Sequence, residues 1–419
     1  MQEFVIEGGR PLRGEVRVQG AKNAALPILA ATVLADGEFV IDEVPCLTDM
    51  EAMLDILREL GVEAWQEKNR VLIDTRGIHS ARIPERLMGK MRSSIFLMGP
   101  LLSRFGEVQV SQPGGCDIGE RRIDLHLRGL EQMGASIELR GGELYCRAKK
   151  LSGSLIYLDY PSVGATENLM MAAVLADGET VIQHAAKEPE IVDLQNFLVA
   201  MGARISGAGT DTIVIQGVEQ LHPVSYRVIP DRIVAGTMMV AAAMTRGDVV
   251  IDRVTPQYVH MVTQLLQQIG NRVEVYPQQI VVQGTDQPRS IAKITTSPYP
   301  GFPTDMQPQM MAYLSICQGT SIVKESVFES RLRHVNELNR MGAHIYTDLN
   351  TAFIRGVEKL SGATVEAYDL RAGAGLVLAG LAAEGVTRVR SIHHIDRGYE
   401  KLEEAFSSLG ARMRREIAE

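Results

Sequence analysis

The sequence predicts an α/β protein built from six copies of a β-α-β-α-β-β unit, three in each of two halves. Three observations support this prediction: a repeated turn glycine, a second glycine series in phase with it, and an apolar run before each turn. The turn glycines are spaced by 69, 72, 69, 72 and 66 residues, at Gly37, Gly106, Gly178, Gly247, Gly319 and Gly385. The second series follows 23 to 28 residues later, at Gly61, Gly134, Gly202, Gly270, Gly342 and Gly410. Two series in phase at one period indicate a repeated structural unit.

Each element of the unit has its own pattern. The run before the turn glycine is apolar on all sides, which predicts a helix that is buried all round. These runs are Ala24–Leu34, Ile95–Leu102, Leu169–Leu175, Val234–Met244, Met310–Ile316 and Ala372–Leu381. A β-rich segment follows the turn, and an amphipathic segment such as Asp49–Leu60 then predicts an outer helix. Gly61 is suited to end that helix because glycine readily adopts the left-handed conformation. Two short strands, for example Val62–Trp65 and Arg70–Ile73, complete the unit.

The apolar helices also decide how the units assemble. A helix without a polar face is unsuited to the surface of a thin solenoid. We therefore expect two globular halves, each with three buried helices inside a wall of sheets and outer helices. The alternative, six unrelated α/β segments, does not explain the phased glycines.

Composition and charge limit the function classes. The 419 residues include 43 Lys and Arg and 51 Asp and Glu, a net charge of −8. This balance argues against a broad nucleic-acid surface, although a local basic pocket for a small anion remains compatible with it. The N-terminus lacks the features of a signal peptide, and the longest apolar runs, such as Ala24–Ala35, are shorter than the ~18 residues of a membrane span. We expect a cytoplasmic protein without membrane or nucleic-acid partners.

The cysteines and the absent motifs exclude further classes. Cys46, Cys116, Cys146 and Cys317 show no CxxC spacing, so neither a zinc site nor a disulfide framework is predicted. The sequence contains no GxGxxG, P-loop, HExxH or GxSxG motif, which argues against redox, NTPase and zinc-hydrolase activities. Cys116 lies in a glycine-rich segment near Arg121 and Arg122, whose charges would make its thiol more reactive; the alternative is an ordinary loop cysteine. The other three cysteines are expected to be structural.

Polar residues recur at one position of the repeat, where the apolar helices are expected to begin. They are Lys22, Asn23, Arg92, Ser162–Thr166, Asp231, Arg232, Asp305 and Arg371. A second position, after the turn glycines, holds Cys116, Glu190, Arg331 and Arg397. Helix N-termini attract anions, so their convergence would form a site for a polyanionic ligand. The alternatives are surface ion pairs for single arginines and helix capping for Ser162, Thr166 and Asp305; a carboxylate at 305 could also serve as a general base.

Over essentially its full length, the chain resembles the UDP-N-acetylglucosamine 1-carboxyvinyltransferases, enolpyruvyl transferases of peptidoglycan synthesis. The matching segments are GAKNAALP around Lys22, KMRSSI around Arg92, GGCDIG around Cys116, PSVGATEN around Ser162, KEPEIVDL around Glu188, PDRI around Asp231, PGFPTDMQ around Asp305 and HHIDRGYE around Arg397. The resemblance implies a two-domain inside-out α/β barrel. One domain would span residues 22–229, the other residues 1–21 and 230–419, with the active site in the cleft between them.

The resemblance also implies a reaction. The enolpyruvyl group of phosphoenolpyruvate would pass to the 3-hydroxyl of UDP-N-acetylglucosamine through a tetrahedral intermediate, with no metal or organic cofactor. Asn23 and Asp305 would hold the attacking hydroxyl, Asp305 accepting its proton. Cys116 would protonate C3 or form a covalent adduct, and fosfomycin, an epoxide phosphonate, would alkylate this thiol.

The implied binding residues fall into two sets. Phosphoenolpyruvate would be bound by Lys22, Arg121 and Arg397, supported by Arg92, Arg331 and Arg371. The binding site for the nucleotide sugar would be lined by Arg121, Asp124, Leu125, Ser162, Val163, Gly164 and Val327.

Two positions depart from the family pattern, and two alternative functions follow from the resemblance. Arg122 replaces a proline of the usual pattern, and Tyr160 stands where some members have lysine. These departures bear on loop closure and uridine binding. One alternative is a 3-phosphoshikimate 1-carboxyvinyltransferase-like enzyme, which Cys116 and the PGFPTDMQ segment disfavour. The other is a catalytically silent UDP-sugar-binding paralogue, disfavoured by the intact Lys22, Cys116, Asp305 and Arg397.

Overall fold

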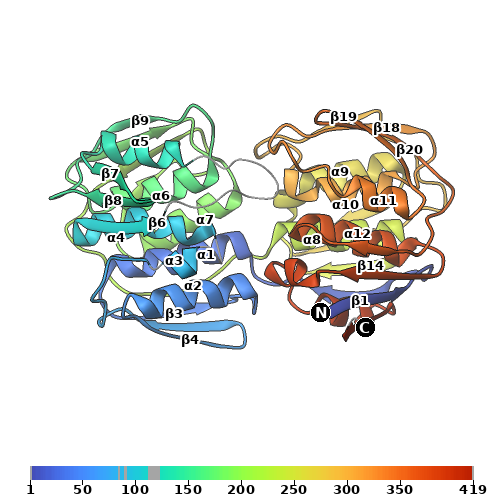
Figure 1. The fold of residues 1–419 in the computed structure, drawn as a ribbon, viewed down its shortest axis with the longest axis horizontal. Coiled ribbons are helices and arrows are strands. Elements are labelled where there is room, and N and C mark those ends of the chain that lie inside the picture. The colour runs from blue at the N-terminus through green and yellow to red at the C-terminus, as the bar shows by residue number, and fades with distance from the viewer. Residues whose placement is uncertain (1, 84, 89–91, 112–122, 418–419) are drawn as a thin grey trace. The chain divides into compact units, whose positions relative to one another are not determined.

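The computed structural model describes residues 2–83, 85–88, 92–111 and 123–417. The chain forms two compact domains, drawn as ribbons in Figure 1. Of the described residues, the central domain comprises 20–83, 85–88, 92–111 and 123–229, and the terminal domain comprises 2–19 and 230–417. The α/β class and the repeated unit predicted from the glycine spacing are confirmed.

Each domain contains three apolar helices and three amphipathic ones. In the central domain the apolar helices are α1 (Lys22–Ala31), α4 (Met98–Phe105) and α6 (Val163–Ala173), and the others are α2 (Thr48–Glu59), α5 (Asp124–Gln132) and α7 (Pro189–Ala200), with a short α3 (Glu85–Met88). In the terminal domain they are α8 (Arg232–Met244), α10 (Gln307–Leu314) and α12 (Leu370–Ala382), with α9 (His260–Ile269), α11 (Val335–Arg340) and α13 (Leu402–Ser408). The described residues also form the 3₁₀ helices η1 (Thr32–Leu34), η2 (Arg92–Leu97), η3 (Pro256–Val259), η4 (Thr304–Met306) and η5 (Ile392–Arg397).

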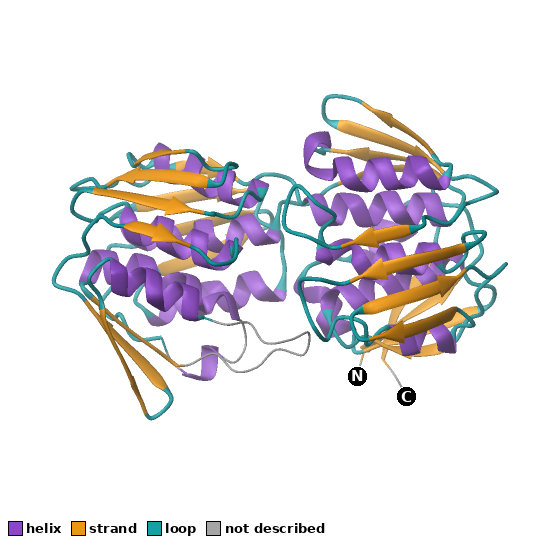
Figure 2. Cartoon of the chain, turned by 90° about the horizontal axis from the view of Figure 1, so that it is seen from above, coloured by secondary structure: helices purple, strands orange, loops and turns teal. Residues whose placement is uncertain are grey.

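Three separate sheets lie around the helices of each domain, as Figure 2 shows. The central domain has β13-β3-β5-β4 (Ser225–Arg227, Glu38–Asp42, Arg70–Asp74, Glu63–Glu67), β6-β8-β7 (Glu107–Ser111, Glu143–Arg147, Ser136–Arg140) and β11-β12-β10-β9 (Arg204–Ser206, Thr212–Gln216, Glu179–Gln183, Leu155–Tyr157). The terminal domain has β15-β16-β14-β2 (Arg272–Val275, Gln279–Gln283, Asp248–Asp252, Arg13–Arg17), β17-β18-β20-β19 (Lys293–Thr295, Thr320–Lys324, Thr351–Arg355, His344–Asp348) and β21-β22-β1-β23 (Thr364–Glu366, Val386–Arg390, Gln2–Glu7, Arg412–Ile417).

Two units exchange their first strands. In three units the strand before the apolar helix pairs in parallel with the strand after it: β9 with β10, β17 with β18 and β21 with β22. By contrast, β2 precedes α1 but pairs with β14 of the terminal domain, while β13 precedes α8 but pairs with β3 of the central domain. The first strand of the chain, β1, lies between β22 and β23 and completes the sixth sheet. The exchange requires the chain to pass between the domains near residues 20 and 229.

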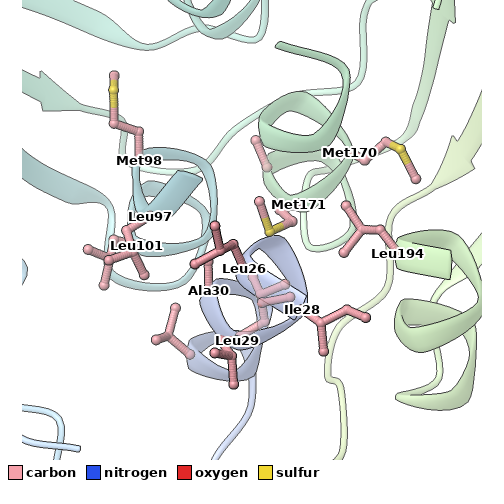
Figure 3. Close-up of a cluster of buried hydrophobic side chains, with 14 of the residues drawn as sticks. Leu26, Ile28, Leu29, Ala30, Leu97, Met98, Leu101, Met170, Met171 and Leu194 are labelled. Atoms are coloured by element: carbon pink, nitrogen blue, oxygen red, sulfur yellow. The ribbon is translucent and has the colours of Figure 1, made fainter. Parts of the chain in front are cut away.

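The apolar helices form the core of each domain. Figure 3 shows Leu26 and Leu29 of α1 near Leu101 of α4 and Met171 of α6 in the central domain. Burying one such side chain stabilises the fold by about 1.5–3 kcal/mol. Gly61 follows α2 with φ of 98°, the left-handed conformation expected at the end of an outer helix. In the described part of the chain, no helix combines the length and the apolar character that crossing a membrane requires.

The three cysteines that were expected to be structural differ in exposure. Cys146 and Cys317 are buried, and burial raises the pKa of their thiols to about 11 and about 12. Cys46 is exposed instead, because it lies in the loop between β3 and α2, where its thiol contacts the Lys68 carbonyl at 3.1 Å.

Candidate active site

The terminal domain brings three of the predicted residues into one cluster. Asp305 lies in η4, just before α10, and Arg371 lies in the first turn of α12. Arg371 Nη2 donates to Asp305 Oδ2 at 3.0 Å, while Arg331 Nη2 lies 2.8 Å from Asp305 Oδ1. Each carboxylate oxygen therefore faces a different guanidinium. Both arginine side chains are nearly inaccessible, at 3% and 5% exposure, whereas that of Asp305 is 25% exposed. The carboxylate is held in place yet still reaches solvent.

Buried hydroxyl and amide groups hold Arg371 from behind. Its Nη1 lies 3.5 Å from the Tyr399 hydroxyl, which shares a hydrogen bond of 2.9 Å with Thr237 and accepts one of 3.2 Å from Gln309. Burial alone would lower the pKa of the guanidinium, but Asp305, Tyr399 and Asp231 raise it above its ordinary value. Arg371 is therefore a fixed positive charge beside Asp305.

The same domain holds three other predicted residues, Asp231, Val327 and Arg397. Asp231 caps α8 by accepting from the Ile233 and Val234 N–H groups at 2.8 and 3.0 Å, a capping role that the sequence analysis did not predict for it. The Val327 N–H donates to Glu325 Oε1 at 2.8 Å. Arg397 is half-buried at the end of η5, and the next residue, Gly398, accepts a hydrogen bond from Gln19 at its carbonyl oxygen.

In the central domain, Lys22 is the first residue of α1. Its Nζ donates to Asp49 Oδ2 at 3.0 Å, and both side chains are buried. Asn23 follows it, half-buried. The Lys22 charge is thus paired with a carboxylate from the first turn of α2, a partner that the repeat pattern did not predict. Arg92 begins η2.

Two helix starts in the same domain hold five of the predicted nucleotide-sugar residues. Ser162 caps α6, its Oγ accepting from the Ala165 N–H at 3.3 Å, so the capping alternative is correct for this residue. Val163 and Gly164 form the first turn of α6, and Asp124 and Leu125 that of α5. The α5 turn packs against α6 closely: a Cβ on Gly164 would lie 3.4 Å from His126 Cε1.

Three predicted or noted residues lie outside the described part of the chain: Cys116, Arg121 and Arg122. Tyr160, the second departure from the family pattern, is exposed, and its carbonyl accepts from the Ser162 N–H at 2.7 Å. It is therefore adjacent to the α6 cap.

Comparison with known proteins identifies the family. The profile described as EPSP synthase (3-phosphoshikimate 1-carboxyvinyltransferase) matches residues 6–406. The chain belongs to this family of enolpyruvyl transferases. It is 51% identical to UDP-N-acetylglucosamine 1-carboxyvinyltransferase 2 of Caldanaerobacter subterraneus subsp. tengcongensis over 411 residues, which cover 98% of this chain and 99% of the relative. It is likewise 51% identical to UDP-N-acetylglucosamine 1-carboxyvinyltransferase of Desulfosudis oleivorans, covering 99% of each chain.

Solved structures agree with this assignment. The enolpyruvyl transferase NikO from Streptomyces tendae superposes with a TM-score of 0.90 at 27% identity and covers 100% of this chain and 99% of that one. An EPSP synthase from Acinetobacter baumannii superposes with a TM-score of 0.77 at 20% identity, with 100% of each chain covered. The second likeness supports the enolpyruvyl transferase fold alone.

Sequence reasoning missed several polar residues that hold the predicted site of this enolpyruvyl transferase. Lys22 is bonded to Asp49, and Arg371 to Tyr399. Arg331 is bonded to Thr304, whose hydroxyl donates to Glu325. Thr304 and Tyr399 lie in segments that match the family, next to Asp305 and two residues after Arg397. Asp49 and Glu325 became visible only when the fold showed them to be buried.

A buried carboxylate behind the α6 cap carries a prediction about stability. Glu167 is fully buried, and within the described residues neither of its oxygens has a hydrogen-bond partner. Burial, reinforced by the charges of Glu190 and Glu188, raises the pKa of Glu167 well above its ordinary value. As pH rises above about 4.3 the unfolded chain ionises there but the folded chain does not, which favours unfolding. Relative to wild type, Glu167→Gln should therefore gain up to about 1.4 kcal/mol per pH unit in free energy of unfolding.

Urea titrations of wild type and Glu167→Gln from pH 5 to pH 8 measure this gain. Glu179→Gln, at an exposed position on β10, is measured in parallel as a control for the loss of a carboxylate. A difference between Glu167→Gln and wild type that stays constant from pH 5 to pH 8 would contradict the prediction.

Proposed function

We propose that this protein transfers the enolpyruvyl group of phosphoenolpyruvate to the 3-hydroxyl of UDP-N-acetylglucosamine and releases phosphate. The observation that carries the proposal is the 51% identity, over nearly the full length, to relatives of that named activity. The product is the first committed precursor of peptidoglycan. We place the reaction in the cytoplasm, since both substrates are multiply charged metabolites that do not cross a lipid bilayer unaided.

The reaction is an addition followed by an elimination. The sugar hydroxyl attacks C2 of phosphoenolpyruvate as a proton is added at C3, giving a tetrahedral intermediate. Loss of a proton from C3 and cleavage of the bond from C2 to the phosphate oxygen then restore the double bond. Asp305 is the proposed acceptor of the hydroxyl proton, since its carboxylate is fixed by two guanidinium groups and remains partly exposed. Cys116 is the proposed proton donor to C3.

Fixed positive charge is the main means of stabilising the intermediate. Phosphoenolpyruvate and the intermediate carry a carboxylate and a phosphate, and preorganised charges stabilise such groups without reorganisation during the reaction. Arg331 and Arg371 are already fixed by their partners. The proposed site also includes Lys22, Asn23, Arg92, Arg121 and Arg397. The starts of α5 and α6, together with Val327, are proposed to bind the nucleotide sugar.

Phosphate release from phosphoenolpyruvate tests the activity. The protein is incubated with phosphoenolpyruvate and either UDP-N-acetylglucosamine, shikimate 3-phosphate or no acceptor. Phosphate release that depends on UDP-N-acetylglucosamine, with formation of its enolpyruvyl ether detected by mass spectrometry, is the expected result. Release only with shikimate 3-phosphate would favour the family's other named activity, and release with neither would contradict an active transferase.

The role of Cys116 leads to a separate prediction. Fosfomycin should add one molecule to the protein through opening of its epoxide by the thiolate, and UDP-N-acetylglucosamine should accelerate the addition by closing the site. Intact-protein mass spectrometry followed by peptide mapping measures rate and position. Cys46 provides an internal control, because it is an exposed thiol outside the proposed site. Modification of Cys46, or of neither residue, would contradict the assignment.

A further inference from the structure

Glu325 is a buried carboxylate that follows β18 and has no role in the proposed chemistry so far. It is 1% exposed. Its Oε1 accepts from Thr296 Oγ1 at 2.8 Å and from the N–H groups of Val327 and Phe328 at 2.8 and 3.2 Å. Its Oε2 accepts from Thr304 Oγ1 at 2.9 Å. Both oxygens are therefore used, and every partner is a donor.

The bond to Thr304 leads to Asp305. Thr304 Oγ1 accepts from Arg331 Nη1 at 2.9 Å, and Arg331 Nη2 lies 2.8 Å from Asp305 Oδ1. A guanidinium can only donate, so the Thr304 hydroxyl must accept from it and direct its own proton to Glu325. The direction of every hydrogen bond from Arg331 to Glu325 is thus determined. Glu325 reaches the carboxylate at 305 through one hydroxyl and one guanidinium.

The other oxygen of Glu325 fixes the backbone at Val327. The segment after β18 forms neither helix nor strand, yet the N–H groups of Val327 and Phe328 both donate to Glu325 Oε1. Ser326 makes two hydrogen bonds to Thr296: its N–H donates to Thr296 Oγ1 at 2.9 Å, and its hydroxyl donates to the Thr296 carbonyl oxygen. One buried anion therefore determines the position of the Val327 backbone and the orientation of the Arg331 side chain.

We propose that Glu325 is a positioning residue that aligns the nucleotide-sugar contact at Val327 with the Asp305–Arg331 pair. This inference rests on the proposed function, because it assumes that Asp305 accepts the hydroxyl proton. The carboxylate acts through Thr304 and does not touch the substrates. Its acceptor-only character is the essential property, since a neutral amide would present a donor either to the two N–H groups or to the Thr304 hydroxyl.

Four variants test the proposal by steady-state kinetics. In Glu325→Gln an amide N–H replaces one acceptor oxygen, which disturbs the hydrogen bonds that lead from Arg331 through Thr304 to residue 325. This variant should lower kcat by about 10–100-fold, the scale of effect when reacting groups are misplaced. It should also raise the KM for UDP-N-acetylglucosamine, because the Val327 segment loses its anchor. Thr304→Val should lower kcat alone, and Thr304→Ser, which keeps the hydroxyl, should restore it. The double variant Glu325→Gln/Thr304→Val should lose no more kcat than the more impaired single variant, because the two residues act in one chain.

A matched control separates positioning from folding. Glu337 is also buried and accepts a backbone N–H, that of Glu366 at 3.1 Å, while its other side-chain contacts among the described residues are with Tyr368 and Arg340 and not with the Asp305 cluster. Glu337→Gln should leave kcat and both KM values within about twofold of wild type. If Glu325→Gln behaves like Glu337→Gln, or if it lowers only the melting temperature, the inference is wrong.

A measurement without turnover separates this inference from the proposed function. Carboxyl ¹³C NMR, with Asp305→Asn to assign the signal, follows the titration of Asp305 in each variant. The charges that face Asp305 are Arg331 and Arg371, with Asp231 beside Arg371 and Glu325 behind Thr304. A misplaced Arg331 should move the titration of Asp305 to higher pH in Glu325→Gln and in Thr304→Val. An unchanged titration would overturn the inference, whereas an inactive wild type with a shifted titration would overturn only the function.

Discussion

Replacing Asp305 by asparagine is expected to lower kcat by roughly 10²–10⁴-fold, the usual contribution of a general base. The amide has nearly the same shape as the carboxylate, but it takes up no proton at neutral pH. It also presents donor hydrogens to Arg331 or Arg371, which can only donate. Phosphate release at saturating substrates, measured from pH 5 to pH 9, determines the loss.

Binding and a surface control complete this test. Calorimetric titration with UDP-N-acetylglucosamine should still show binding by Asp305→Asn, which demonstrates a folded site. Asp248→Asn, on the strand β14 of the same domain, changes an exposed aspartate bonded to Gln283 and should retain full activity. A kcat for Asp305→Asn within threefold of the wild-type value would remove Asp305 from the proton transfer.

Replacing Arg371 by methionine is the second change with a large expected effect, because it affects both activity and stability. Removing one partner of a buried ion pair costs about 3–5 kcal/mol, and we expect about 2–3 kcal/mol here because Asp305 is partly exposed and keeps Arg331. The Tyr399 hydroxyl also loses a donor in the interior. The kcat/KM for phosphoenolpyruvate should fall by about 10²–10³-fold, the effect of removing one preorganised donor.

Arg371→Lys distinguishes charge from geometry in the same experiment. Lysine keeps the positive charge but lacks the planar fork that contacts Asp305 and Tyr399 together. We therefore expect most of the stability to return and only part of the activity. Urea denaturation and phosphate release measure the two quantities. Arg272→Met, which removes an exposed ion pair with Glu274, is the matched control and should change stability by less than about 1 kcal/mol. Full activity in Arg371→Met would contradict the assignment.

The repeated architecture could be predicted from the sequence for a simple physical reason. A helix that is apolar on every side, such as α8, can only be stable when buried, and this constraint recurs in all six units. The turn and helix-end glycines mark backbone conformations that other residues rarely adopt, so their spacing records the repeat length. Both features depend only on the type and spacing of neighbouring residues, so they can be recognised in the sequence.

The exchange of strands between the two units could not be predicted from the residues in this way. Arg13–Arg17 precedes α1 in the sequence, and nothing in its composition indicates that it pairs with Asp248–Asp252 rather than with Glu38–Asp42. Strand pairing depends on which backbone edges meet in space. For this reason, the domain bounds near residues 22 and 229 were implied only by the family resemblance.

The sequence by itself determined the repeat, the buried helices and the group of basic and acidic residues at the helix starts. Only the tertiary structure decided which of those charges meet: Asp305 lies between Arg331 and Arg371, and Lys22 is paired with Asp49. It also revealed Glu325 and Tyr399, which hold these charges from the interior. Ion pairs and buried hydrogen bonds join residues that are far apart in the chain, and their strength depends on distance and burial. Neither quantity exists until the chain has folded.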